Sequence, residues 1–169
     1  MGSADVVVGV SASGRTPYVL GALEAAGQAG AVTACVVSVE GSELAASVEH
    51  AVVVVVGPEF LAGSTRLKAG TAQKLVLNTI STVSMIRLGK TYGNLMVDVV
   101  ATNDKLRDRV RRIVEVATGA SATEVATALD ESHGDAKVAI VMLLGGTDAV
   151  TASERLAGAG GVVRKALGQ

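Results

Sequence analysis

Aromatic side chains are almost missing from this sequence. Its 169 residues include no Trp, one Phe and two Tyr, and the formal net charge is −1. Proteins that bind nucleic acids usually need a basic surface, and many use aromatic rings that stack on bases. The composition therefore predicts a protein with no nucleic-acid partner.

Long hydrophobic runs are also missing. The two most apolar stretches, AVVVVVG at residues 51–57 and VAIVMLLGG at residues 138–146, are much shorter than the roughly 20 residues that span a bilayer. The opening residues MGSAD show neither the basic segment nor the apolar segment of a secretory signal. We therefore expect a soluble protein with no membrane partner, and a cytoplasmic location as the default.

Cysteine and histidine are too scarce to indicate a metal site or a thiol nucleophile. Cys35 is the single cysteine, and it lies in the alternating run AVTACVVSV, where a buried strand thiol is the expected environment. His50 and His133 are isolated in the sequence, and we interpret both as structural or surface residues. The sequence predicts no metal site.

The first third of the sequence alternates between strand and helix patterns. Hydrophobic residues make up 49% of the chain, which is enough to bury a core. Strands joined by helical crossovers form a parallel sheet, so this order predicts the α/β class. We expect strands at residues 5–10, 32–37 and 51–56, and helices at residues 17–29 and 42–47.

Beyond residue 57 the pattern becomes helical. Asn103 or Thr102 is a suitable cap for one helix, and Gly119 a suitable end. Four arginines in that helix alternate with acids, a pattern typical of a solvated face with i,i+4 pairs. We expect a long helix at residues 64–88, a short one at 94–98 and a well-marked one at 103–118.

The last fifty residues predict a small helical appendage of three short helices separated by glycines. Ser121 with Glu124 fits a capping box, and Thr147 is a suitable cap before Asp148. We therefore predict two domains, at residues 1–118 and 119–169.

The stretch SASGRTP at residues 11–17 follows the first strand and precedes the first helix. Thr16 can cap that helix, and Pro17 suits its first position. A turn at the amino end of a helix offers backbone N–H groups and the positive end of the helix dipole, which favour an anion such as phosphate. An ordinary polar turn explains the same residues, so the motif alone is a weak signal.

Longer blocks carry a stronger signal. The strings GVSASGRTPYV, GPE, GSTRLKAGTAQK and NLMVD, followed by TN and KL, occur in an order and spacing that closely resemble the N-acetylmuramic acid 6-phosphate etherases, which have sugar-isomerase-type (SIS) domains. The resemblance extends through the helical tail to residue 169. It implies a flavodoxin-like, doubly wound parallel-sheet SIS fold, truncated at the amino terminus and followed by the small helical appendage.

The resemblance also implies the site and its ligand. The SxSGxT-type loop of SIS domains holds the phosphate of a phosphosugar, and the GPE glutamate with the serine and threonine after it approaches the sugar. Glu59 is thereby a tentative catalytic residue, while Lys68 and Lys74 are equally well interpreted as solvated helix lysines. The implied substrate-binding residues are Ser11, Ser13, Gly14, Arg15, Thr16, Ser64, Thr65, Arg66 and Lys68.

The implied activity is cleavage of the D-lactyl ether of N-acetylmuramic acid 6-phosphate without metal or organic cofactor, in a homodimer. Family members carry a first SIS half with the main acid/base residues, and this sequence resembles only the carboxyl-terminal half. An inactive fragment of an etherase, a phosphosugar-binding regulatory module and a structural half that pairs with another chain all remain open.

Overall fold

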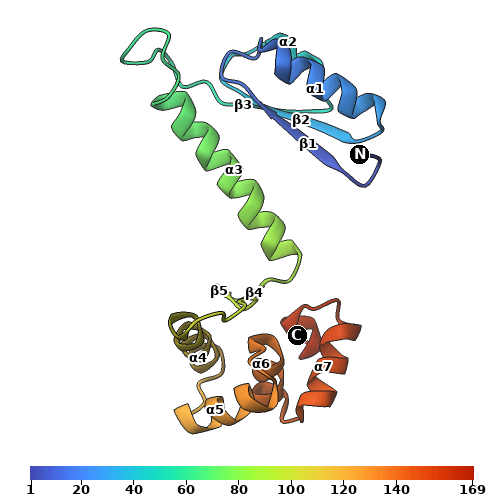
Figure 1. Cartoon of the computed structure of the whole chain (residues 1–169), viewed down its shortest axis with the longest axis vertical. Helices are drawn as coiled ribbons and strands as arrows, with labels where there is room; N and C mark the ends of the chain where they lie inside the picture. Colours follow the sequence, from blue (N-terminus) through green and yellow to red (C-terminus); the bar gives the residue numbers. More distant parts are fainter. The chain divides into compact units, whose positions relative to one another are not determined.

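The computed structural model describes residues 1–169, which form two compact units, Met1–Ile80 and Ser81–Gln169. We refer to them as the amino-terminal and carboxyl-terminal units and describe each by itself. The long helix α3 (Lys68–Arg87) has residues in both units (Figure 1).

The amino-terminal unit contains a three-stranded parallel sheet in the order β1-β2-β3, which confirms the predicted α/β class. The strands are formed by valine-rich runs, since branched side chains suit a sheet. β3 ends at Val53, earlier than the expected residue 56. The strands are β1 (Val6–Val10), β2 (Val32–Val37) and β3 (His50–Val53).

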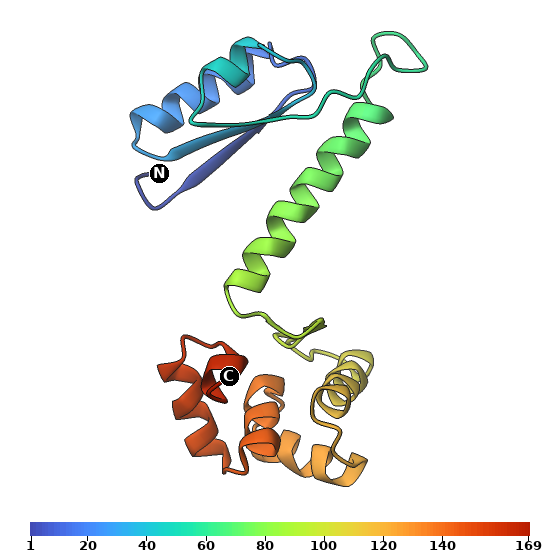
Figure 2. The same ribbon diagram turned by 180° about the vertical axis from the view of Figure 1, so that it is seen from behind.

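Helices α1 (Pro17–Gln28) and α2 (Glu43–Ala46) both lie on one face of this sheet (Figures 1 and 2). Leu23 of α1 and Leu44 of α2 form a buried cluster with Cys35 and Val37 of β2. Cys35 is therefore a core residue, as its sequence context predicts, and burial raises the pKa of its thiol.

In the carboxyl-terminal unit a hairpin follows the end of α3. β4 (Thr91–Tyr92) and β5 (Leu95–Met96) are antiparallel and joined by Gly93 and Asn94, so the short helix expected at residues 94–98 is wrong. Gly93 has a φ of 57°, and glycine allows this tight turn because it lacks a Cβ atom.

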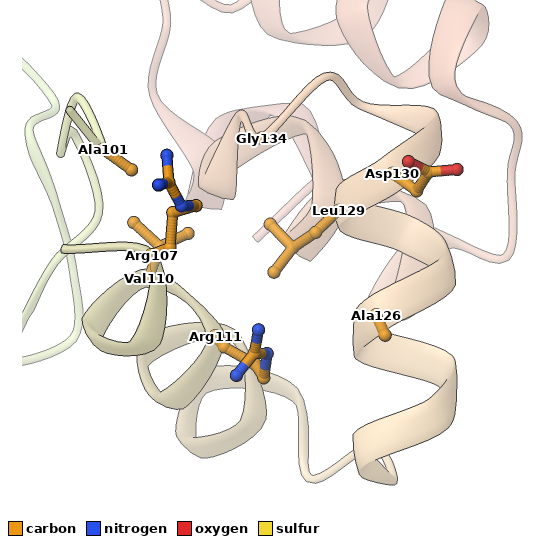
Figure 3. Close-up of a pocket in the computed structure, with 8 residues that line it drawn as sticks. All are labelled: Ala101, Arg107, Val110, Arg111, Ala126, Leu129, Asp130 and Gly134. Carbon is orange, nitrogen blue, oxygen red and sulfur yellow. The ribbon is translucent and has the colours of Figure 1, made fainter. Parts of the chain in front are cut away.

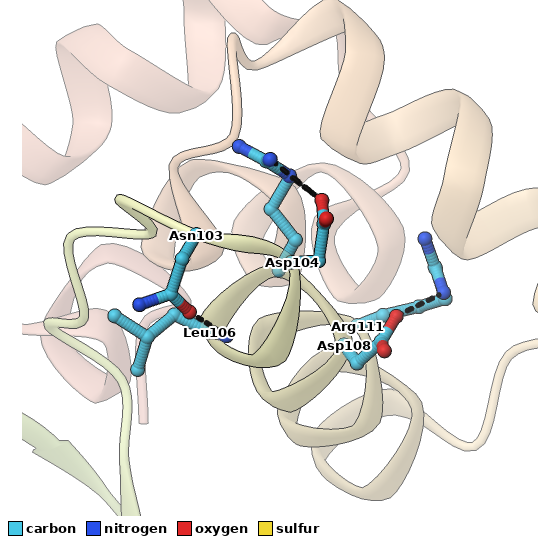
Figure 4. Close-up of polar contacts among 6 residues, drawn as sticks. Asn103, Asp104, Leu106, Asp108 and Arg111 are labelled. Carbon is cyan, nitrogen blue, oxygen red and sulfur yellow. Dashed lines mark hydrogen bonds and ion pairs between the residues drawn. The ribbon is translucent and has the colours of Figure 1, made fainter.

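Helix α4 (Asp104–Thr118) has the predicted ends. The Asn103 side chain accepts a hydrogen bond from the Leu106 N–H at 3.0 Å, and Gly119 ends the helix with a φ of 70° (Figure 4). The arginine pairs have i,i+3 spacing rather than the expected i,i+4 spacing: Arg107 pairs with Asp104 at 2.6 Å and Arg111 with Asp108 at 3.0 Å.

Four helices follow α4, one more than expected, because the last predicted helix is divided at two glycines. Ser121 and Glu124 form the predicted capping box, whereas Asp148 rather than Thr147 caps α7 through the Thr151 N–H. The helices are α5 (Ala122–Glu131), α6 (Ala136–Gly145), α7 (Ala149–Gly158) and α8 (Val163–Ala166).

The core of this unit joins α4 to the helices that follow it. Val114 of α4, Val125 of α5 and Ile140 of α6 are fully buried in one cluster. The domain boundary expected between residues 118 and 119 stays a prediction, because packing within one unit does not define a domain.

No single helix is long and apolar enough to span a membrane. Only α6 and α7 taken together are long and apolar enough, and they are bent by 106° where they meet. Five residues of α6 are buried in the protein core. A buried core helix explains the apolar character of α6.

Candidate functional site

The loop between β1 and α1 lies at the carboxyl end of the sheet. The Ser11 N–H donates to the Val36 carbonyl at 3.1 Å, and the Ser38 N–H donates to the Ala12 carbonyl at 3.0 Å. The loop is thus fixed to β2 on the side from which the β2–α2 connection leaves. The structure places the SASGRT residues where the sequence predicts them, before the first turn of α1.

Two hydroxyls of this loop bond inward. Ser11 is only 7% exposed, and its Oγ accepts a hydrogen bond from the Gly14 N–H at 3.1 Å. The hydroxyls of Ser11 and Thr16 share a hydrogen bond of 2.8 Å, and Thr16 makes no side-chain cap on α1, contrary to the expectation for that residue. These two side chains therefore stabilise the loop conformation.

Ser13 and Arg15 are the exposed polar side chains of the loop's tip. The Ser13 Oγ accepts a long hydrogen bond from the Arg15 N–H at 3.4 Å, and the Ser13 hydroxyl hydrogen has no acceptor within the protein. A hydroxyl donor and a guanidinium beside the amino end of a helix form a suitable environment for an anion.

Gly14 joins this loop to α2. Its φ is 65°, and a Cβ atom at this position would lie 2.3 Å from the Ser42 Oγ. Its carbonyl accepts a hydrogen bond from the Leu44 N–H at 3.0 Å. Gly14 is thus required by the close approach of α2. The sequence analysis assigned this glycine to phosphate access and did not predict the contact with α2.

Ser38 is a site residue that sequence reasoning did not single out. It follows β2 and contacts the loop through its N–H, and its Oγ is buried without a hydrogen-bond partner. The only available signal was the serine at the end of the AVTACVVSV strand run, which indicates a polar group at the carboxyl edge of a parallel sheet.

Glu59 occupies the amino end of α3. Its two carboxylate oxygens accept hydrogen bonds from the N–H groups of Lys68 and Ala69, both at 3.0 Å. These hydrogen bonds, the one from Lys68 first, lower the pKa of the Glu59 carboxyl below its ordinary value. A carboxylate held in this way is a helix cap, which is a less suitable general base than a free one.

The residues between Glu59 and α3 form a turn. The predicted helix start at Ser64 is wrong, because α3 begins at Lys68, where Glu59 provides the cap. Ser64 and Thr65 therefore precede the helix, and the Thr65 carbonyl accepts from the Gly70 N–H at 2.9 Å. Arg66 is exposed in this turn, while the Lys68 Nζ donates to the Pro58 carbonyl at 2.8 Å.

No hydrogen bond joins the two predicted parts of the site, the β1–α1 loop and the segment from Glu59 to the start of α3. The β1–α1 loop bonds to residues of β2 and α2, and the hydrogen bonds of the Glu59 side chain end on the start of α3. Both loops follow parallel strands, so both leave the sheet at the carboxyl ends of its strands.

Other polar groups of the chain form no comparable site. No group of three or more His, Cys, Asp or Glu side chains is arranged to hold a metal ion. A hollow of about 260 Å³ lies beside α4, but Arg107 and Arg111 in its lining are already paired with aspartates of α4 (Figure 3). That helix face is a solvated ion-paired surface.

Known proteins match this chain over its whole length. It is 64% identical over 169 residues to the N-acetylmuramic acid 6-phosphate etherase of Rubrobacter xylanophilus, of which it covers 56%. The etherase of Streptomyces coelicolor is 59% identical over 163 residues, which are 96% of this chain and 52% of the relative. The Deinococcus radiodurans etherase is 54% identical over 169 residues and 55% covered.

No protein-family model matches the chain. The chain spans about half the length of the curated relatives that it matches, and the identity within that half ranges from 64% in the R. xylanophilus etherase to 52% in the etherase of Alkaliphilus metalliredigens. The SASGRT loop, the GPE block and the helical tail all lie inside the match to the R. xylanophilus etherase, which covers the entire chain. The chain therefore belongs, as a partial-length member, to the N-acetylmuramic acid 6-phosphate etherase family.

Proposed function

We propose that this chain is the phosphosugar-binding part of an N-acetylmuramic acid 6-phosphate etherase. The observation that carries the proposal is the geometry of the β1–α1 loop, in which Ser13 and Arg15 are exposed beside the amino end of α1. Donors at a helix amino terminus bind phosphate in many α/β proteins. The names of the relatives supply the sugar.

The reaction of the whole enzyme would be that of a carbon-oxygen lyase. Elimination breaks the ether bond and releases D-lactate, and addition of one water molecule gives N-acetylglucosamine 6-phosphate. This chemistry transfers protons and needs no change in oxidation state, so we propose no cofactor. Its place would be amino-sugar catabolism and peptidoglycan recycling, in the cytoplasm, by a homodimer with an SIS fold.

Within this chain the proposed division of work is simple. Ser11 and Thr16 fix the loop through their shared hydrogen bond, and Gly14 allows α2 to approach it. Ser13 and Arg15 contact the phosphate. Ser64, Thr65 and Arg66 lie in the turn before α3, from which they would approach the sugar. Glu59 caps the amino end of that helix, and the Lys68 ammonium donates a hydrogen bond to the Pro58 carbonyl.

A second function has a specific observation in its favour. The Glu59 carboxylate accepts two backbone hydrogen bonds and its pKa is lowered, so it is poorly suited to accept a proton from substrate. A non-catalytic phosphosugar-binding or regulatory module needs the phosphate loop and no acid/base group. Binding without lactate release under every condition, including addition of the rest of a family chain, would favour this module.

The phosphate loop is tested by a titration with glucosamine 6-phosphate, followed through backbone amide shifts and calorimetry. Ser13→Ala removes a hydroxyl donor to a charged acceptor, and we expect the affinity to fall about tenfold. Ser153→Ala, which removes an exposed hydroxyl from α7, is the matched control and should bind as the wild type does. Equal binding by all three proteins, or shifts that map away from residues 11–16, would show that the loop is only a turn.

A further inference from the structure

Ser38 carries the only buried side-chain oxygen or nitrogen of this chain that forms no hydrogen bond within the protein. Its Oγ is shielded from solvent, yet no protein group pairs with it. Buried hydroxyls are nearly always hydrogen-bonded, because removing one from water without a new partner costs free energy. The unpaired Ser38 hydroxyl is therefore not explained by the packing of the sheet.

A second buried hydroxyl of the same strand shows the contrast. Thr33, near the amino end of β2, is only 6% exposed, and its Oγ1 accepts a hydrogen bond from the Glu49 N–H at 3.3 Å. Ser38 follows the carboxyl end of β2 directly, and its N–H is bonded whereas its hydroxyl is not. The hydroxyl at the structural end of the strand is thus paired, and the one at the end that bears the candidate site is free.

Ser38 lies between the two predicted parts of the site. In the sheet order β1-β2-β3, the β1–α1 loop follows one outer strand and the segment with Glu59 follows the other (Figure 1). Backbone hydrogen bonds fix the end of the middle strand on both sides. The Ser38 N–H donates to the Ala12 carbonyl at 3.0 Å, and the Val54 N–H donates to the Val37 carbonyl at 2.8 Å. Ser38 therefore occupies the carboxyl edge of the sheet between those two segments.

A sugar phosphate bound at this edge has to extend across the end of β2. In the proposed function its phosphate lies at Ser13 and Arg15, and its sugar is approached from residues 64–66, which follow β3. The ring hydroxyls of a hexose both donate and accept hydrogen bonds, and a serine hydroxyl can pair with them in either direction. Residue 38 as a whole is partly exposed, so a rotation about χ1 is the movement that turns its hydroxyl toward the ring.

We propose that Ser38 is a sugar-binding residue, whose hydroxyl pairs with a ring hydroxyl of the phosphosugar and favours the sugar phosphate over free phosphate. This inference rests on the proposed function and deepens it, because it assigns a contact to the sugar rather than to the phosphate. The free chain bears the cost of the unpaired hydroxyl, and the bound sugar removes it. An internal water molecule is the competing partner, and it would make Ser38 indifferent to the sugar.

The test titrates the chain with inorganic phosphate and with glucosamine 6-phosphate, followed through backbone amide shifts. We expect Ser38→Ala to weaken the binding of glucosamine 6-phosphate about fivefold, the size of one hydrogen bond between uncharged groups. The same variant should bind inorganic phosphate as the wild type does. Ser13→Ala should weaken both ligands, because its contact is with the phosphate group.

Unfolding of the free chain separates a binding role from a structural one. Ser38→Ala removes an unpaired buried hydroxyl, so we expect it to unfold at a higher denaturant concentration than the wild type. Thr33→Val is the matched control from the same strand. It leaves the Glu49 N–H without its acceptor, so it should unfold at a lower denaturant concentration and bind both ligands normally.

The proposal is overturned if Ser38→Ala binds glucosamine 6-phosphate as tightly as the wild type, which is the result expected for an internal water as the partner. It is also overturned if inorganic phosphate weakens by the same factor, or if Ser38→Ala unfolds at a lower denaturant concentration. The proposed phosphate loop fails in a different way, when the wild type binds neither ligand or Ser13→Ala binds both normally. Absence of any binding overturns the assignment of Ser38 as well.

Discussion

Two glycines of the amino-terminal unit are required by close contacts. A Cβ atom on Gly9 of β1 would lie 2.5 Å from the Leu23 Cδ1 of α1, and one on Gly14 would lie 2.3 Å from the Ser42 Oγ. Gly14 has the additional constraint of a left-handed backbone, with a φ of 65°. These contacts allow α1 and α2 to lie close to the strand and the loop that form the candidate phosphate site.

Gly14→Ala should destabilise the amino-terminal unit. The left-handed backbone alone costs an alanine roughly 1–2 kcal/mol, and displacement of Ser42 from the amino end of α2 adds to that loss. Denaturant unfolding measures the free energy change, and the Ser13-dependent phosphate titration should weaken in parallel.

Gly21→Ala is the control, because a Cβ atom there has open space within α1. That variant should gain about 0.5–1 kcal/mol. An unchanged stability of Gly14→Ala would contradict the requirement for glycine.

At the scale of elements, the carboxyl-terminal unit contains a charge cluster that joins the hairpin to the helices. Asp98, just after β5, forms an ion pair with Lys90, and its second oxygen lies 3.7 Å from the Lys137 Nζ of α6. Lys137 also donates to the Gly161 carbonyl at 3.0 Å. The hydrogen bond from Lys90 holds the pKa of Asp98 below its ordinary value, and the charge of Lys137 acts in the same direction.

This cluster predicts a pH-dependent stability. Because the pKa of Asp98 is lower in the folded than in the unfolded protein, its contribution is complete above about pH 4 to 5 and is lost as the pH falls through the folded-state pKa. Asp98→Asn should remove this contribution, which for a partly exposed pair is at most about 1 kcal/mol. Unfolding curves between pH 2 and 7 should therefore converge for the two proteins at the acid end. Asp130→Asn, which removes an exposed carboxylate of α5, serves as the control. If the unfolding curves of Asp130→Asn and the wild type differed at neutral pH and converged in acid, while those of Asp98→Asn did not, the pH dependence would not come from Asp98.

The elements that the sequence predicts best are those with signals near their own ends. Asn103 and Gly119 bound α4 as expected, and the Ser121–Glu124 capping box begins α5. The start of α3 was not predictable in this way, because its cap, Glu59, lies nine residues before Lys68. The hairpin was missed although Gly-Asn is a turn signal, because each strand has only two residues and no alternation can be recognised.

The position of the β1–α1 loop could be predicted from the sequence, whereas its internal contacts could not. A Ser/Gly-rich turn between a strand and a helix can be located from sequence alone, so residues 11–16 were assigned to the correct loop. The inward hydrogen bond between Ser11 and Thr16 and the contact of Gly14 with Ser42 depend on how the chain folds back on itself. Sequence patterns carry no information on such contacts.

At the scale of the whole molecule, the candidate site lacks a free acid/base group. Elimination of lactate needs a positioned group that takes a proton and one that supplies it. In the Glu59–Lys68 turn the Glu59 carboxylate is occupied by two amide hydrogen bonds and has a lowered pKa, so it remains ionised and capped at neutral pH. The chain also covers only 52–56% of three etherases compared with it.

We therefore expect this chain by itself to release no detectable D-lactate from N-acetylmuramic acid 6-phosphate, even at concentrations where the Ser13-dependent titration shows bound sugar phosphate. A coupled D-lactate dehydrogenase assay measures the release, and the full-length R. xylanophilus etherase provides the positive control. Glu59→Gln keeps the shape of the side chain while removing its charge, so it should weaken the cap of α3 and leave the absence of turnover unchanged. Lactate release by the wild-type chain would contradict this prediction, whatever the effect of Glu59→Gln.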